Sequence, residues 1–130
     1  MEHKTHLQKL LLQQIERCLR YNSFRSAVFI SSSWKLDSIV ECLQAACDDL
    51  YIKSRVVRIR KSNGKSSVEF DNGSFLEIIT ARENARGKRI HCALIDDTID
   101  KDFVDCVLKP MLRPLIDKKY INDAILYFHL

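Results

Sequence analysis

The stretch Ile90-His91-Cys92-Ala93-Leu94-Ile95-Asp96-Asp97-Thr98 is a short apolar run that ends abruptly in two carboxylates. A strand covered on both faces shows near-continuous apolar residues, and ligands of open α/β sheets bind beyond the carboxyl ends of such strands. The stretch therefore predicts a buried strand with Asp96 and Asp97 at its tip. The pair has two interpretations: metal or phosphate chemistry, or capping of a following helix whose first turn carries Asp100 and Asp102.

Length and composition place limits on the class of protein. A chain of 130 residues is long enough for one domain with a sizeable core, so we expect residues 1–130 to form a single unit. Hydrophobic content of 46% and charged content of 29% are typical of a globular protein and argue against disorder. The first six residues lack the pattern of a signal peptide, and no apolar run reaches transmembrane length. We therefore expect a cytoplasmic protein without membrane contact.

Cysteine and histidine usage argues against disulfides and zinc. The five cysteines are an odd number without a Cys-x-x-Cys pair, and most fall at positions that look core-facing. This pattern predicts reduced, buried thiols. The four histidines show no metal-ligand spacing with them, so a zinc site is not expected.

Positive charge is concentrated in the middle of the chain. Between Lys53 and Lys65 there are six basic residues and no acid, whereas the net charge of the chain is only +4. Such a segment permits contact with a polyanion, and a solvated basic face is the alternative. The candidate contacts to nucleic acid are Arg55, Arg58, Arg60, Lys61, Lys65 and Arg86.

The first third of the chain predicts a helix followed by a β-α unit. Apolar residues at helical spacing indicate a helix over residues 5–20, and residues 27–30 read as a short buried strand. The serines at 31–33 are N-cap candidates for a second helix whose apolar face runs over residues 36–50. Trp34 at this turn has two interpretations, a stacking platform for a base or packing where the helix joins the sheet.

The remainder predicts an antiparallel meander and then a return to α/β structure. Turn signals at residues 62–65 and 71–74 separate a half-exposed strand at 55–60 from strands at 67–70 and 75–80. A polar loop over 81–88 leads into the opening strand. A third helix follows Asp97 and should be kinked or ended by Pro110 and Pro114. Residues 118–120 lie in a loop, and Ala124–Phe128 form a last apolar strand.

From Phe24 onward the order of motifs resembles the ATPase domain of the large subunit of phage DNA-packaging terminases. The resemblance implies an α/β fold with a partial P-loop-NTPase-like sheet flanked by helices and carrying the β-meander. The segments that carry it are Ala27-Val28-Phe29-Ile30-Ser31, Asp71-Asn72-Gly73-Ser74, Glu83-Asn84-Ala85-Arg86-Gly87, Leu94-Ile95-Asp96-Asp97 and Val107-Leu108-Lys109-Pro110-Met111-Leu112.

The same resemblance implies roles at an ATP site. Asp96 and Asp97 look like a Walker B pair, in which the first carboxylate holds Mg²⁺ through water and the second, usually Glu, activates the attacking water. Lys4 and Thr5 stand where the family's phosphate-binding Lys-Thr opens a helix, but His3 occupies a glycine position. We therefore expect no tight ATP binding and lapsed catalytic roles for the pair, with Mg²⁺ and ATP as cofactors only where another chain completes the site.

The family's sheet also contains strands beyond the one that corresponds to Ala124–Phe128, so an uncovered edge is expected there. We expect a homodimer or a partner protein to pair with this edge, with DNA as a further candidate partner. The leading hypothesis is a phage or prophage protein of the bacterial cytoplasm that acts by binding in a DNA-packaging context. The alternatives are a packaging ATPase fragment completed by another chain and a basic nucleic-acid-binding module.

Overall fold

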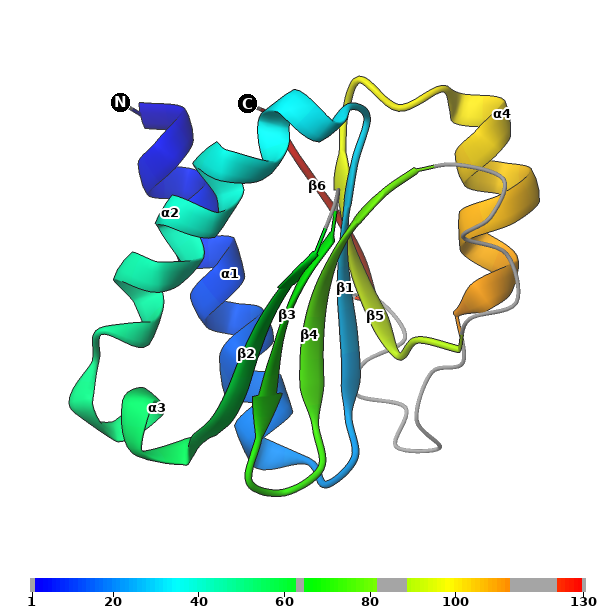
Figure 1. The fold of residues 1–130 in the computed structure, drawn as a ribbon. Helices are drawn as coiled ribbons and strands as arrows, with labels where there is room; N and C mark the ends of the chain where they lie inside the picture. The colour runs from blue at the N-terminus through cyan, green and yellow to red at the C-terminus, as the bar shows by residue number, and fades with distance from the viewer. Residues whose placement is uncertain (1, 63–64, 82–88, 113–123, 130) are drawn as a thin grey trace.

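The computed structural model describes residues 2–62, 65–81, 89–112 and 124–129, with the backbone alone at 2–5, 62 and 65. These residues form a six-stranded sheet with helices on both faces, which confirms the predicted α/β class (Figure 1). The strands are β1 (Arg25–Ile30), β2 (Val56–Ser62), β3 (Lys65–Phe70), β4 (Phe75–Thr80), β5 (Cys92–Asp96) and β6 (Ile125–Phe128).

The sheet has a parallel half and an antiparallel half, in the strand order β2-β3-β4-β1-β5-β6. β1 pairs in parallel with β4 on one side and β5 on the other, and β5 pairs in parallel with β6. β2, β3 and β4 form the antiparallel meander. β1, β5 and β6, the three strands predicted from apolar runs, are therefore neighbours, and the meander lies on the other side of β1.

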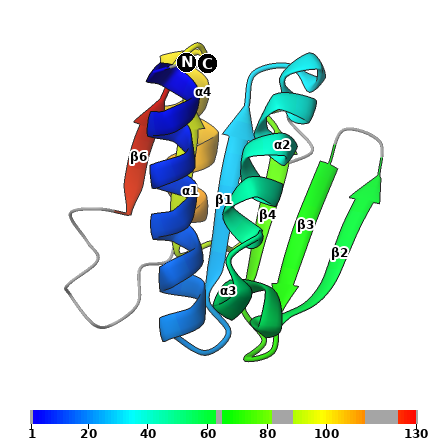
Figure 2. The same ribbon diagram turned by 90° about the vertical axis from the view of Figure 1, so that its left-hand side faces the viewer.

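Two long helices and two short ones cover one face of the sheet (Figure 2). They are α1 (Glu2–Arg20), the 3₁₀ turn η1 (Ser33–Lys35), α2 (Leu36–Cys47) and α3 (Leu50–Arg55). Their apolar stripes pack on the side chains that β1, β3, β4 and β5 direct to this face, because alternate strand residues point the same way. The largest members of this core include Leu7, Leu11, Ile15, Phe24, Ile39, Phe70, Leu76, Ile78, Leu94 and Phe128.

The opposite face is covered by one irregular helix. It runs through α4 (Lys101–Phe103), a wide π turn η3 (Val104–Leu108) and a tight 3₁₀ turn η4 (Lys109–Met111). Pro110 lies in η4 and has no N–H to continue a regular ladder, so the predicted interruption at this proline is confirmed. The helix packs on Ala27, Phe29, Ile79, Ala93 and Ile95, all of them on β1, β4 and β5.

The turn between β3 and β4 ties the meander to the end of α1. Gly73 has φ +82°, a conformation that glycine adopts without strain. The Asn72 side chain donates to the carbonyls of Cys18 at 2.8 Å and Tyr21 at 3.2 Å. Ser74 Oγ donates to the Tyr21 carbonyl at 2.6 Å and accepts from Phe24 N at 2.9 Å. This motif therefore has a structural role in the fold.

The predicted second helix ends earlier than its apolar pattern suggested. α2 stops at Cys47, and Asp49 begins the separate helix α3 by accepting hydrogen bonds from Tyr51 N at 2.9 Å and Ile52 N at 3.2 Å. Leu50 was predicted on the buried face but is 84% exposed. The capping carboxylate redirects the chain, so the helical pattern could not continue to residue 50.

Two further expectations were wrong. Trp34 is 72% exposed, so the packing interpretation of this residue does not hold. Cys106 is exposed, whereas the other four cysteines are buried thiols as predicted. No helix among the described residues has the length and apolar character needed to cross a membrane. The predictions for residues 82–88, Pro114 and 118–120 lie outside the described residues.

Candidate functional site

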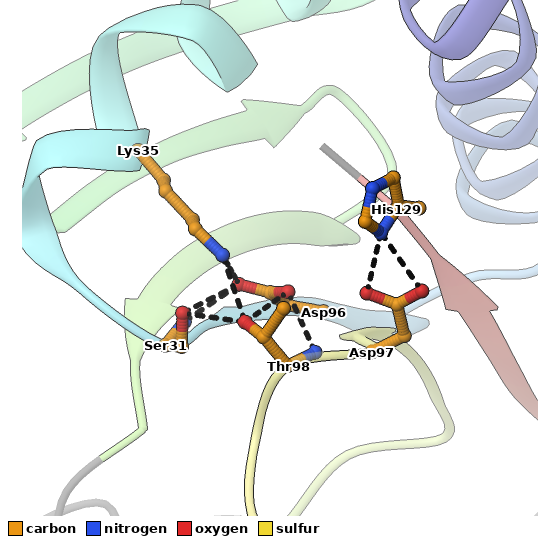
Figure 3. A network of polar contacts seen from close by, with 6 residues as sticks. All are labelled: Ser31, Lys35, Asp96, Asp97, Thr98 and His129. Carbon is orange, nitrogen blue, oxygen red and sulfur yellow. Dashed lines mark hydrogen bonds and ion pairs between the residues drawn. The ribbon is translucent and has the colours of Figure 1, made fainter.

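The carboxyl ends of β1 and β5 lie side by side and bring Asp96, the first acid of the predicted pair, next to Ser31 and Lys35 (Figure 3). Phe29 is paired with Ile95, so the next residues, Ile30 and Asp96, end their strands together. When two parallel strands end side by side, the loops that leave them begin at one site. Ser31, directly after β1, therefore lies within hydrogen-bond distance of Asp96.

Asp96 is fully buried and accepts hydrogen bonds from five protein donors. Oδ2 accepts from Ser31 N at 2.9 Å, Ser31 Oγ at 2.8 Å and Lys35 Nζ at 2.8 Å. Oδ1 accepts from Thr98 N at 3.0 Å and Thr98 Oγ1 at 2.8 Å. A carboxylate offers about four lone-pair sites. The protein itself therefore satisfies this carboxylate.

The Lys35 ammonium is the only charged donor in this set of contacts, and its side chain is buried as well, at 6% exposure. It also donates to Thr98 Oγ1 at 2.8 Å, and that oxygen lies 2.9 Å from Ser31 Oγ. Burial raises the pKa of the Asp96 carboxyl, but hydrogen bonds from Lys35, the Ser31 backbone and Thr98 outweigh this effect. The pKa of Asp96 is therefore held well below its usual range, and this carboxylate is ionised at neutral pH.

Asp97 points away from Asp96, toward the end of β6 (Figure 3). Its backbone N donates to the Phe128 carbonyl at 2.8 Å, and His129 Nδ1 lies 3.0 Å from Oδ1 of its side chain. The Asp97 and His129 side chains are 42% and 53% exposed. The two neighbouring carboxylates thus occupy different environments, one enclosed by protein donors and one open to solvent.

The capping interpretations do not describe these side chains. The N-cap of α4 is Asp100, without a side-chain cap hydrogen bond, and Asp96 bonds instead within its own turn. The N-cap of η1 is Ser32, also without such a bond. The hydroxyl of Ser31, predicted as a cap candidate, goes to Asp96. Sequence patterns singled out the strand end and the serines but carried no signal for Lys35 or Thr98.

The resemblance also assigned phosphate binding to Lys4 and Thr5. Both lie in the first turns of α1, and their side chains are outside the described part. Among the residues that are described, no three His, Cys, Asp or Glu side chains gather as metal ligands. Asp96 as arranged does not fit a cation, because its oxygens already receive five donors and an ammonium stands beside them.

The predicted contacts to nucleic acid that the structure describes lie at the end of α3, on β2 and at the start of β3. Arg55 Nε donates to Asp71 at 2.7 Å. Arg58 and Arg60 are exposed and pair across the ladder with Glu69 and Ser67. Lys61 alternates with Arg60 along β2 and is exposed, the Lys65 side chain lies outside the described part, and so does Arg86.

Comparisons with known proteins inform on the fold. No family model and no curated protein sequence matches the chain. Among solved structures, the chain is similar to a mutant of the large terminase ATPase domain of Thermus phage P74-26. The TM-score is 0.59 at 9% sequence identity, over 96% of this chain and 71% of that one. At this identity the likeness shows the fold alone, and the chain therefore has a terminase-ATPase-like fold.

Proposed function

We propose that this chain is a terminase-like phage or prophage module that acts by binding in a DNA-packaging assembly and does not turn over ATP. The likeness of its fold to a terminase ATPase domain supports the context. The observation that supports the proposed lack of ATP turnover is the buried contact of 2.8 Å between Lys35 Nζ and Asp96 Oδ2.

The physical argument concerns the first acid of a Walker B pair. Such an acid holds a Mg²⁺ ion through water and must present free lone pairs to it. In this chain an ammonium already neutralises Asp96, and Ser31 and Thr98 occupy its remaining acceptor positions. A divalent cation brought to this carboxylate would be repelled by Lys35 at close range in a buried site, where charges are weakly screened.

The binding surface in this proposal is the outer edge of β6. β6 is the last strand of the sheet order, and its residues Ile125, Leu126, Tyr127 and Phe128 carry no charge. Tyr127 is 51% exposed. An uncharged edge strand can pair with a copy of itself without opposing like charges. A second copy of this chain is therefore the proposed occupant, with another protein of the assembly as the alternative.

ATP hydrolysis and Mg·ATP-dependent thermal shift test the absence of turnover. A ligand raises the melting temperature according to its occupancy, so wild type should melt at the same temperature with and without Mg·ATP. The matched variant is Asp97→Asn, because Asp97 is exposed and its substitution leaves the buried network intact. Hydrolysis by wild type that Asp97→Asn abolishes would establish an enzyme instead. Activity that rises more steeply than linearly with protein concentration would indicate a site completed by another chain.

Light scattering over a concentration series tests the edge of β6. The expected result is a species of twice the 15.1 kDa chain mass, which Tyr127→Lys shifts toward the monomer without loss of the folded structure. A wild-type monomer at every concentration would rule out self-association through this strand. Leu50→Lys is a suitable control, because Leu50 is also an exposed apolar residue but lies at the start of α3.

A further inference from the structure

The second outer strand of the sheet, β2, differs from the uncharged strand β6 because it carries exposed basic side chains. It is the first strand in the sheet order and lies at the opposite side from β6 (Figure 2). Its side chains are exposed from Val57 to Lys61, with Val57 at 60% and Ile59 at 52%. Among the described strands its partner is β3 alone, so the outer row of its backbone N–H and C=O groups is available for pairing.

The pairing of β2 with β3 shows which type of residue lies opposite each β2 side chain on the two faces of the sheet. Ile59 lies opposite Val68, which belongs to the core beneath the helices. On the other side of the sheet Arg58 lies opposite Glu69, and Arg60 lies opposite Ser67. β3 thus offers an alternation of acidic, apolar and polar residues that matches the basic, apolar and basic residues of β2.

Arg58 and Arg60 carry their positive charges at exposed positions of β2. Neither guanidinium forms an ion pair with a described residue, whereas Arg55 on the same segment is paired with Asp71 at 2.7 Å. Both arginines line a shallow depression of about 270 Å³ on the helix-free side of the meander. Its lining residues are Arg58, Arg60, Ser67, Glu69, Phe75 and Glu77.

A second copy of β2 is a poor occupant of this edge. In an antiparallel pairing centred on residue 58, 59 or 60, at least one arginine lies directly opposite another arginine. Like charges at directly opposed positions destabilise a strand pair. Nucleic acid is also disfavoured, because a phosphate backbone has no N–H and C=O groups to pair with the open ladder of β2.

We infer that the outer edge of β2 binds an extended acidic segment of another protein by strand addition. Carboxylates of that segment meet Arg58 and Arg60, an apolar side chain covers Ile59, and main-chain hydrogen bonds continue the sheet. Charge complementarity selects the partner and excludes self-pairing, as charged edge strands do in other sheets. This site is independent of the proposed loss of ATP turnover and of the β6 edge.

The probe is a fluorescein-labelled peptide of about eight residues that alternates glutamate and valine, a length that spans one strand. Fluorescence anisotropy should show saturable binding to wild type that weakens with salt. The variant Arg58→Glu/Arg60→Glu should weaken it about tenfold or more, because two attractive contacts become repulsive. The milder Arg58→Gln/Arg60→Gln serves if charge reversal beside Glu69 lowers the melting temperature.

Two controls separate strand addition from general attraction. Lys9→Gln/Lys53→Gln removes two positive charges from exposed positions on α1 and α3, as the glutamine variant does on β2, and should bind the peptide like wild type. Amide hydrogen exchange within β2 should slow when the peptide is bound. The inference is overturned by an absence of peptide binding, by equal loss in the Lys9/Lys53 variant, by unchanged exchange in β2, or by tighter binding of single-stranded DNA than of the peptide.

Discussion

The parallel half of the sheet and the meander differ in how much of each strand the helices cover. Every side chain of β5 is buried, as is every side chain of β1 after Arg25. In β3 buried residues alternate with half-exposed or exposed ones, and β2 is exposed from residue 57 to 61. Among the described residues, the core beneath α1, α2 and α3 includes Val56 of β2 but neither Val57 nor Ile59, and the core beneath α4, η3 and η4 contains residues of β1, β4 and β5 but none of β2 or β3.

This difference separates residues that stabilise the protein from residues that can recognise a partner. In the parallel half a buried carboxylate has its donors inside the protein, as Asp96 does with Lys35 and Thr98. In the meander the arginines of β2 are exposed to solvent. Substitutions in the parallel half should therefore lower the stability of the protein, whereas substitutions on β2 should affect the binding of a partner.

The largest expected effect is that of Asp96→Asn. Asparagine places an amide N–H against donors that now bond the carboxylate and leaves the Lys35 ammonium buried without a counter-charge. Removal of one partner of a buried ion pair costs about 3–5 kcal/mol. Urea denaturation should show this loss in the free energy of unfolding.

The double variant Lys35→Met/Asp96→Asn is the control for this prediction. It removes the unpaired charge, so its unfolding free energy should lie above that of Asp96→Asn alone. A matched surface pair is Asp105 with Lys109, four residues apart and exposed, where Asp105→Asn should cost far less than Asp96→Asn because solvent screens the pair. Equal losses of unfolding free energy in Asp96→Asn and Asp105→Asn would contradict the prediction that the buried ion pair matters more for stability than the surface pair.

The next effect is a loss of stability in acid that depends on Asp96. The folded-state pKa of this carboxyl lies below the unfolded value of about 3.9, so the unfolded chain takes up the proton first. The stabilisation is present in full above the unfolded-state pKa and is lost as the pH falls toward the folded-state pKa. Unfolding free energies measured between about pH 7 and pH 2 should fall less steeply in Lys35→Met/Asp96→Asn than in wild type.

A smaller effect is expected near neutral pH from His91, which precedes β5. Its Nδ1 accepts a hydrogen bond from Arg25 N at 2.9 Å, which only the neutral ring can do. Burial and, to a lesser degree, the Arg25 cation lower the pKa of His91. The contribution is present above the unfolded-state pKa of about 6.5 and lost as the pH falls through the lowered value.

The expected loss is under about 1 kcal/mol, the range of a single hydrogen bond. His91→Gln supplies an amide oxygen that accepts without titrating, so thermal unfolding of this variant should be flat between about pH 7 and pH 5. Persistence of the wild-type pH dependence in that window would assign it to another group.

The smallest effect on stability is expected at Ile59 in β2, and Ile95 in β5 is the contrasting position in the other half of the sheet. Ile59→Ala in β2 should change the unfolding free energy by about 0.5 kcal/mol or less, because the side chain is already 52% exposed. Ile95→Ala in β5, where the side chain is 1% exposed, should cost about 2–5 kcal/mol. Similar losses in urea denaturation would show that β2 is covered in solution.

Local sequence patterns predicted most of the strands and the antiparallel pairing of the meander. The run before Asp96 was identified as a buried strand, and the turns at 62–65 and 71–74 were identified as breaks in a meander. The misses came where one side chain overrode a pattern. Asp49 caps a new helix and so exposes Leu50, and the shift in register between Val56 and Arg58 leaves Val57 exposed on a strand that seemed half-buried.

The candidate site likewise has features that the sequence predicts and features that it does not. The sequence by itself determined that two carboxylates follow a buried strand and that the middle of the chain is basic, because periodicity and spacing depend on near neighbours. Only the tertiary structure decided that Lys35 meets Asp96, which is 61 residues away, and that Arg58 and Arg60 lie at an open edge without an ion-pair partner among the described residues. The order of the strands in the sheet brings these distant residues together. That order depends on how all the strands and helices pack, so it cannot be derived from any single stretch of sequence.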